Sequence, residues 1–183
     1  IKTKYYKPGN VFLGIPHRLD RPTSGVVIFA KTSKCLSRLN KLFKDGKVQK
    51  YYWAITKNKP EKPEDTLIHW LRKNEKTNKS THFKKETTKA KKAVLHYKVL
   101  KKLERYFVIE IELETGRHHQ IRCQLKAIGC PIKGDLKYGY DRSNEDGGID
   151  LHAKKIIFEH PVNGKKIIID APVRDTKIWN AAK

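Results

Sequence analysis

The sequence predicts an α+β domain in which a mostly antiparallel or mixed β-sheet carries packed helices. Hydrophobic residues make up 38% of the 183 residues, which is enough for a packed core although 33% of the residues are charged. Segments with the alternation of strands outnumber segments with the spacing of helices. Most neighbouring segments are joined by short connections, which favours antiparallel pairing. A chain of this length fits one domain that spans residues 1–183.

The first part of the chain contains two predicted strands around one helix. Residues 24–32 (SGVVIFAKT) are rich in β-branched side chains and are predicted to form a buried strand. Ser33 is a candidate N-cap for a helix that Gly46 ends. The apolar positions of this helix recur at helical spacing, at Leu36, Leu39, Leu42 and Phe43. Residues 47–56 (KVQKYYWAIT) are predicted to form the next strand.

Residues 57–92 differ from the rest in composition. They open with Lys-Asn-Lys-Pro-Glu-Lys-Pro and contain one short apolar patch, at residues 67–71. We therefore expect a long, basic and partly mobile insertion that adds little to the core.

The second part of the chain is predicted to return to regular structure. Residues 93–103 and 106–114 read as strands, and the second alternates apolar side chains with glutamates, which indicates a half-buried antiparallel strand. Residues 118–128 have helical spacing, with Gly129 as the expected stop. Residues 151–158 and 165–170 are predicted to pair as a hairpin across the turn at Asn163-Gly164.

The charge of the chain points to a polyanionic partner. Lys and Arg number 41 against 19 Asp and Glu, for a net charge of +22, which is typical of nucleic-acid-binding proteins. A purely solubilising role for the charge is the alternative. No apolar run approaches the roughly 18 residues of a membrane span, and the basic stretch 84–102 lacks a broad apolar helical face. The cysteines, Cys35, Cys123 and Cys130, have no metal-type spacing and indicate reduced thiols and a cytoplasmic protein. Because the chain has no Met and begins at Ile1, we expect it to lack an N-terminal segment.

The first unusual motif is HRLDRPTSG, which places one carboxylate among cations just before a predicted strand. Its charged residues are His17, Arg18, Asp20 and Arg21. One interpretation is a structural Asp–Arg pair in a loop. The other is a carboxylate that arginines hold in the ionised form, ready to act as a nucleophile or a base.

The second motif is GRHHQIR, where a predicted strand turns through a glycine into a helix. It brings five polar residues to the helix start, namely Arg117, His118, His119, Gln120 and Arg122. Cations at the positive end of a helix cost about 0.3–1 kcal/mol, so an anion is expected beside them. Asp20 or a phosphate would meet this need, and a solvated helix end is the simpler alternative. His118 and His119 are adjacent and are expected to point in different directions, which makes them a poor metal pair.

The third motif, QKYYWA, carries a lysine and two tyrosines on a predicted strand. Strand alternation places Tyr51 and Tyr52 on opposite faces, so that one can pack in the core while the other lines a cleft. A tyrosine in a cleft beside the cation of Lys50 can stack on an extruded base, an interaction worth about 1–3 kcal/mol in other single-strand binders.

Together and in this order, these motifs resemble the signatures of the RluA-like pseudouridine synthases. The resemblance rests on HRLDRPTSG, KYYWAI, GRHHQIRCQLKAIGCPIKGDLKYG and LHAKKIIFEHPV, and it covers residues 16–173, with 57–92 the least alike. It implies that Asp20 is the catalytic aspartate and that Arg18 helps to displace the target base. It also implies that Tyr52 stacks on the uracil and that Arg122 pairs with the catalytic carboxylate. The same motifs supply the expected RNA contacts, at His17, Arg18, Arg21, Lys50, Arg117, His118, His119 and Gln120. His118 replaces the threonine that is usual in the family.

The resemblance implies an isomerase that acts on a flipped-out uridine in rRNA or tRNA. It further implies a domain that lacks the family's N-terminal strand segment. The sequence shows no Gly-rich phosphate loop and no metal-ligand cluster, so we expect no cofactor and no metal; no DNA partner is expected, and a monomer is the default expectation. The sequence leaves open whether Asp20 attacks C1′ or removes a sugar proton. Three alternatives remain, which are an RNA-binding module without catalysis, a glycosidase or nuclease, and a basic structural protein. A typical glycosidase needs two carboxylates and a metal nuclease needs clustered acids, and HRLD holds one carboxylate.

Overall fold

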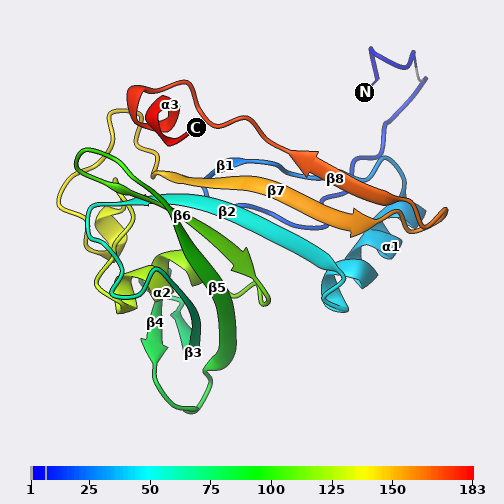
Figure 1. The fold of residues 1–183 in the computed structure, drawn as a ribbon. Helices are drawn as coiled ribbons and strands as arrows, with labels where there is room; N and C mark the ends of the chain where they lie inside the picture. Colours follow the sequence, from blue (N-terminus) through cyan, green and yellow to red (C-terminus); the bar gives the residue numbers. More distant parts are fainter. Residues whose placement is uncertain (1, 7) are drawn as a thin grey trace.

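One mixed β-sheet organises the molecule (Figure 1). The structure, a computed structural model, describes residues 2–6 and 8–183. Within them the strand order is β1-β7-β2-β6-β5-β3-β4, and β8 pairs with the other half of the β7 edge. β1 and β7 are parallel and the other pairs are antiparallel. The predicted α+β class with a mixed sheet is therefore confirmed.

The elements have the following bounds, in chain order. The strands are β1 Ser24–Gly25, β2 Val48–Thr56, β3 Glu64–Asn74, β4 Lys79–Phe83, β5 Lys91–Lys102, β6 Phe107–Leu113, β7 Leu151–Glu159 and β8 Lys166–Asp170. The helices are α1 Ser33–Lys44, α2 Gln120–Ala127, a 3-10 turn Leu136–Tyr138 (η1) and α3 Lys177–Ala182. No helix in residues 2–6 and 8–183 is long and apolar enough to cross a bilayer.

Helices pack on both faces of the sheet. Ile109 and Ile111 of β6 face α2, where Leu125 is fully buried against them. Val108, the residue before Ile109 on β6, belongs to a different core cluster and packs with Trp179 of α3. Each such apolar side chain contributes about 1.5–3 kcal/mol by leaving water. Because α2 is fixed to the sheet in this way, its first turn has a defined position.

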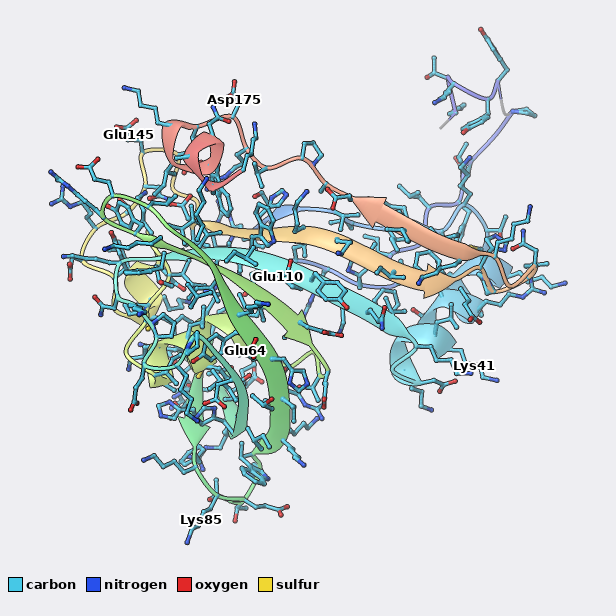
Figure 2. The ribbon with its side chains drawn as sticks, viewed as in Figure 1. Lys41, Glu64, Lys85, Glu110, Glu145 and Asp175 are labelled. Atoms are coloured by element: carbon cyan, nitrogen blue, oxygen red, sulfur yellow. The ribbon has the colours of Figure 1, made fainter. Side chains whose placement is uncertain are left out.

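The segment 57–92 is not the loose insertion that its composition predicts. It forms β3 and β4, and β3 pairs with β5 from Glu64↔Lys98 to Leu71↔Lys91. Leu67 and Leu71 are 6% and 4% exposed, so the short apolar patch belongs to the core. The prediction of little core was wrong because the strand pairing and the cover of α2 come from distant parts of the chain. Figure 2 shows Lys85 projecting from the loop that joins β4 and β5, at the end of the lobe that these strands form.

Two local predictions before β2 also need correction. The predicted strand 24–32 pairs as a strand only at Ser24–Gly25, and the chain then continues to an isolated bridge between Gly14 and Ala30. Gly25 has a φ of +117°, and a Cβ there would lie 2.3 Å from the carbonyl oxygen of Ala153, so the chain crosses β7 at close range. The N-cap of α1 is Thr32 rather than Ser33, since the Thr32 hydroxyl accepts the Cys35 N–H.

In the second half of the polypeptide the predicted strands and helix are present, but some of them begin or end at residues other than those predicted. β5 and β6 form the expected antiparallel pair. α2 begins at Gln120 rather than His118, because His119 adopts a left-handed conformation with a φ of 50°. β7 and β8 pair as predicted, but residues 160–165 form a longer loop than the two-residue turn expected at Asn163-Gly164. α3 was not predicted from the sequence.

Candidate active site

The three sequence motifs meet at one pocket of about 630 Å³, a size typical of ligand sites. The loop at residues 17–23 forms one wall, β2 and the end of β6 form the floor, and the first turn of α2 closes it. Among its lining residues are the predicted Asp20, Lys50, Tyr52, Arg117, His119 and Arg122. The fold therefore collects side chains from positions 17 to 122 around one carboxylate.

Asp20 occupies the wall of this pocket. Its side chain is 28% exposed, so that solvent or a ligand can reach it. Its Oδ2 lies 3.4 Å from Arg122 Nη1 and 3.8 Å from His119 Nε2. The Thr23 N–H donates to the Asp20 carbonyl, and the Ile149 N–H donates to that of Pro22. These backbone bonds hold the loop against the segment that enters β7.

Arg122 contacts Asp20, but its principal partner is a carboxylate that the sequence motifs did not single out. Its Nε and Nη2 donate to the two oxygens of Asp135 at 2.7 and 2.8 Å, and both residues are buried. Burial lowers the pKa of Arg122, but the hydrogen bonds and charge of Asp135 outweigh it and raise that pKa above its ordinary value. The guanidinium is thus a fixed cation, and its remaining nitrogen, Nη1, faces Asp20.

Tyr52 forms part of the pocket floor next to Asp20. It packs against the core that α2 covers, and its register shifts from that of Tyr51 by a β-bulge. Burial, followed by the charge of Asp20, raises the pKa of the Tyr52 hydroxyl to about 12, so the phenol stays protonated. Tyr51 lies outside the pocket, with the Lys155 ammonium 4.6 Å from its ring centroid. One tyrosine of the pair lines the cleft, as strand alternation predicts.

The two adjacent histidines lie together, against the sequence-based expectation. The rings of His118 and His119 stack with centroids 3.8 Å apart and an interplanar angle of 24°. The left-handed backbone at His119 rotates its side chain onto that of its neighbour. His119 is buried and faces Asp20, and burial lowers its pKa even though the charge of Asp20 opposes this. His118 does not line the pocket and contacts Ser80 of β4.

Of the four lysine and arginine residues that were predicted to contact RNA, some line the pocket and one does not. Lys50 and Arg117 line it, and burial lowers the pKa of Lys50. Arg18 is exposed at the pocket wall. Arg21 is exposed and lies outside the lining. Arg18, Lys50 and Arg117 therefore present their charges to the pocket, and within the described residues none of the three has an acid partner within 4 Å.

Two other residues that were predicted to contact RNA, His17 and Gln120, make hydrogen bonds to other parts of the protein. The Ile28 N–H donates to His17 Nε2 at 3.0 Å, and the His17 ring stacks on Phe43. Gln120 is 3% exposed; its oxygen accepts from Thr115 Oγ1 and the Arg117 N–H, while its nitrogen donates to the Val94 carbonyl. These contacts fix the loop and the start of α2.

The sequence did not identify two residues that hold this site together, Asp135 and Tyr138. Asp135 holds Arg122, and Tyr138 contacts both His119 and the backbone of Ser80. Asp135 and Tyr138 lie within the GDLKYG segment that was recognised only as part of a resemblance. Among residues 2–6 and 8–183, no three His, Cys, Asp or Glu side chains group as metal ligands would. The expectation of no metal and no cofactor stays a prediction.

Comparisons with known proteins identify relatives of this chain. The chain is 32% identical over 178 residues to the tRNA pseudouridine synthase C of Vibrio parahaemolyticus, which covers 87% of this chain and 72% of that protein. It is 35% identical over 165 residues to the ribosomal large subunit pseudouridine synthase C of Rickettsia bellii, which covers 88% and 54%. The chain spans about half the length of the Bacillus subtilis relative YlyB, to which it is 34% identical.

Solved structures share the fold. The human RNA pseudouridylate synthase domain containing 1 protein superposes with a TM-score of 0.77 at 22% identity, over 97% of this chain and 75% of that chain. The human domain containing 4 protein gives a TM-score of 0.74 at 23% identity, over 93% and 74%. A family model described as RNA pseudouridylate synthase matches residues 1–127. The chain therefore belongs to the RluA-like RNA pseudouridine synthase family.

Proposed function

We propose that this protein isomerises uridine to pseudouridine in RNA and that Asp20 is its catalytic carboxylate. One observation carries the proposal: Asp20 lies in the wall of a pocket beside Tyr52, with Arg122 and His119 directed at its carboxylate. Glu114 also lines the pocket, but it bonds to His96 at 2.7 Å and its side chain is 55% exposed. The pocket thus has one carboxylate held among buried donors, which disfavours the two-carboxylate glycosidase alternative.

The reaction needs no net input of atoms or electrons. The N1–C1′ bond breaks, the uracil turns, and a C5–C1′ bond forms; the C5 proton leaves to solvent while N1 gains a proton. Asp20 can serve by attacking C1′, with later release, or by taking a proton from the sugar. Either route requires an ionised carboxylate at the start, and the Arg122 cation 3.4 Å away supplies its counter-charge.

The pocket side chains divide the remaining tasks. The target uridine must leave its stack, at a cost of a few kcal/mol. Arg18, exposed on the pocket wall, is placed to fill the vacated space or meet a phosphate. The Tyr52 ring offers a surface for the detached uracil, and its protonated hydroxyl adds no charge beside Asp20.

The substrate is proposed to be a structured rRNA or tRNA. The support is the net charge of +22 and the names of the relatives, one of which is a tRNA and another a ribosomal large subunit pseudouridine synthase. Residues 57–92 are proposed to hold the RNA backbone, because lysines remain exposed on this lobe although its strands are packed. Residues 1–183 are proposed to be the catalytic domain, acting as a monomer in the cytoplasm.

The test uses RNA that carries tritium at C5 of uridine. Because C5 loses its hydrogen when the C5–C1′ bond forms, wild-type protein should release tritium into water. Asp20→Asn should abolish release but still bind the RNA, since the substitution removes one charge and no donor. Release that persists in Asp20→Asn would refute the catalytic role, and no release by wild-type protein on total RNA would refute the proposed activity.

A further inference from the structure

Two buried hydrogen bonds link β4 to His119, and the His119 ring in turn lies beside Asp20. The backbone N–H of Ser80 donates to the Tyr138 hydroxyl oxygen at 2.8 Å. That hydroxyl lies 3.0 Å from His119 Nδ1. The other ring nitrogen of His119, Nε2, lies 3.8 Å from Asp20 Oδ2. Ser80, Tyr138 and His119 are all at most 9% exposed, so bulk water has little access to these bonds.

The donors in this series of hydrogen bonds determine which nitrogen of His119 carries the proton. A backbone N–H can only donate, so the Tyr138 oxygen accepts from Ser80. The Tyr138 hydroxyl then has its own proton to place, and a buried hydroxyl proton needs an acceptor. Within the described residues, His119 Nδ1 is the acceptor at hydrogen-bond distance. A neutral His119 that accepts at Nδ1 carries its proton on Nε2, which faces Asp20.

The surroundings of His119 favour the neutral ring. Burial lowers its pKa below the ordinary 6.5, and the nearby cations Arg122 and Lys137 and the His118 ring act in the same direction. The charge of Asp20 acts in the opposite direction and does not overcome burial. Tyr138 keeps its proton because burial raises its pKa to about 12.

β4 holds Ser80, the first donor of this series of hydrogen bonds. Within residues 2–6 and 8–183, β4 pairs only with β3, so the backbone groups on its other edge are available to other partners. Both backbone groups of Ser80 have partners there: its N–H donates to Tyr138, and its carbonyl accepts from the Cys123 thiol at 3.3 Å. The Ser80 hydroxyl contacts the ring and the carbonyl of His118. The segment 57–92 therefore connects directly to the first turn of α2.

We propose that His119 is a positioning residue that directs a neutral Nε2–H at Asp20, and that Tyr138, held by Ser80 of β4, sets this tautomer. The present N–O separation of 3.8 Å is just beyond a hydrogen bond, and such contacts often tighten when substrate binds. The bond would hold one carboxylate oxygen while Arg122 faces the same group from α2. The inference rests on the proposed role of Asp20.

The tautomer can be read without any activity measurement. Protein with 15N-labelled histidine should show, at pH 7.5, a protonated Nε2 and an unprotonated Nδ1 for His119, with the resonance assigned by its loss in His119→Gln. Tyr138→Phe removes the donor to Nδ1 and should shift His119 toward the other tautomer. Tyr51→Phe is the matched control, because it makes the same change at a tyrosine outside the pocket and should leave the His119 tautomer unchanged. A protonated Nδ1 in the wild-type protein would overturn the proposal.

Kinetics then separate positioning from structural support. In His119→Gln the amide nitrogen reaches the place of Nε2 and can still donate to Asp20. In His119→Asn the amide reaches only the place of Nδ1, so the contact with Tyr138 is kept and the donor to Asp20 is lost. Asn also tolerates the left-handed backbone of this position better than Gln. If support for the fold were the role, Asn would be the better replacement.

We expect the opposite order of activity. His119→Asn should lower kcat about ten- to one-hundred-fold, the range for a lost hydrogen bond to a charged group, with little change in KM. His119→Gln should retain a clearly higher kcat. An Asn variant as active as the Gln variant would overturn the positioning role. Failure of the wild-type protein to release tritium would instead refute the proposed function, and the nitrogen spectra would still report the tautomer.

Discussion

Replacing each of the two carboxylates around Arg122 should separate stability from catalysis. Asp135 is 1% exposed and binds the guanidinium with two hydrogen bonds of 2.7 and 2.8 Å. Asp20 is 28% exposed and lies 3.4 Å from the third nitrogen. Asp135→Asn leaves a buried cation without its close counter-charge, and breaking a buried pair in this way costs about 3–5 kcal/mol. Asp20→Asn loses a longer, partly solvated contact worth about 1 kcal/mol or less.

The assay is urea denaturation of the wild-type protein and both variants at pH 7.5, followed by tryptophan fluorescence. Asp135→Asn should lower the free energy of unfolding by several kcal/mol, while Asp20→Asn should stay close to wild type and lose tritium release. The two substitutions make the same chemical change, so each serves as the control for the other. Equal destabilisation by both, or a larger cost for Asp20→Asn, would refute the assignment of Asp135 as the structural partner of Arg122.

Three further predictions concern stacking, pH and RNA binding. Tyr52→Leu should lower kcat about five- to one-hundred-fold, because stacking on a base is worth about 1–3 kcal/mol, whereas Tyr52→Phe, which keeps the ring, should lose less; equal losses in tritium release would argue against stacking. The free energy of unfolding should decrease as the pH falls below about 6.5, because folding lowers the pKa of several histidines, so the unfolded chain binds more protons there; a flat urea profile between pH 7.5 and 5.5 would contradict this. The histidines concerned are His17, His69, His82, His118, His119 and His152. Reversing the charges of the exposed Lys84 and Lys85 in one double variant should weaken RNA binding and flatten the dependence of RNA affinity on salt concentration. The control Lys177→Glu on α3 should change this salt dependence less. An unchanged salt dependence in the double variant would exclude the lobe of residues 57–92 from the RNA contact.

The regular elements could be predicted because their signals are local. The alternation of β6 and the helical spacing of α2 follow from which side chains face one shared core. The segment 57–92 could not be predicted in this way. Its lysines dominate the composition, but the pairing of β3 with β5 and the burial of Leu67 and Leu71 depend on residues twenty or more positions away. Tertiary pairing here overrides local composition.

The residues of the candidate site could be predicted where they lie within a recognisable sequence motif and also face the pocket. Asp20, Tyr52 and Arg122 were singled out, and the structure brings them together. Asp135 and Tyr138 were not assigned roles, because nothing in GDLKYG itself indicates that a buried arginine and a histidine lie beside it. The stacking of His118 and His119 depends on one left-handed residue, and a histidine offers no glycine-like signal for that conformation.

The central claim is that Asp20 catalyses pseudouridine formation at defined sites in cellular RNA. The most direct test maps pseudouridine across total RNA from cells that lack this gene, complemented with the full-length wild-type protein or its Asp20→Ala variant. We predict that one or a few rRNA or tRNA sites disappear without the gene and return only with the wild-type protein. Sites that never change, or that return equally with the Asp20→Ala variant, would contradict the account.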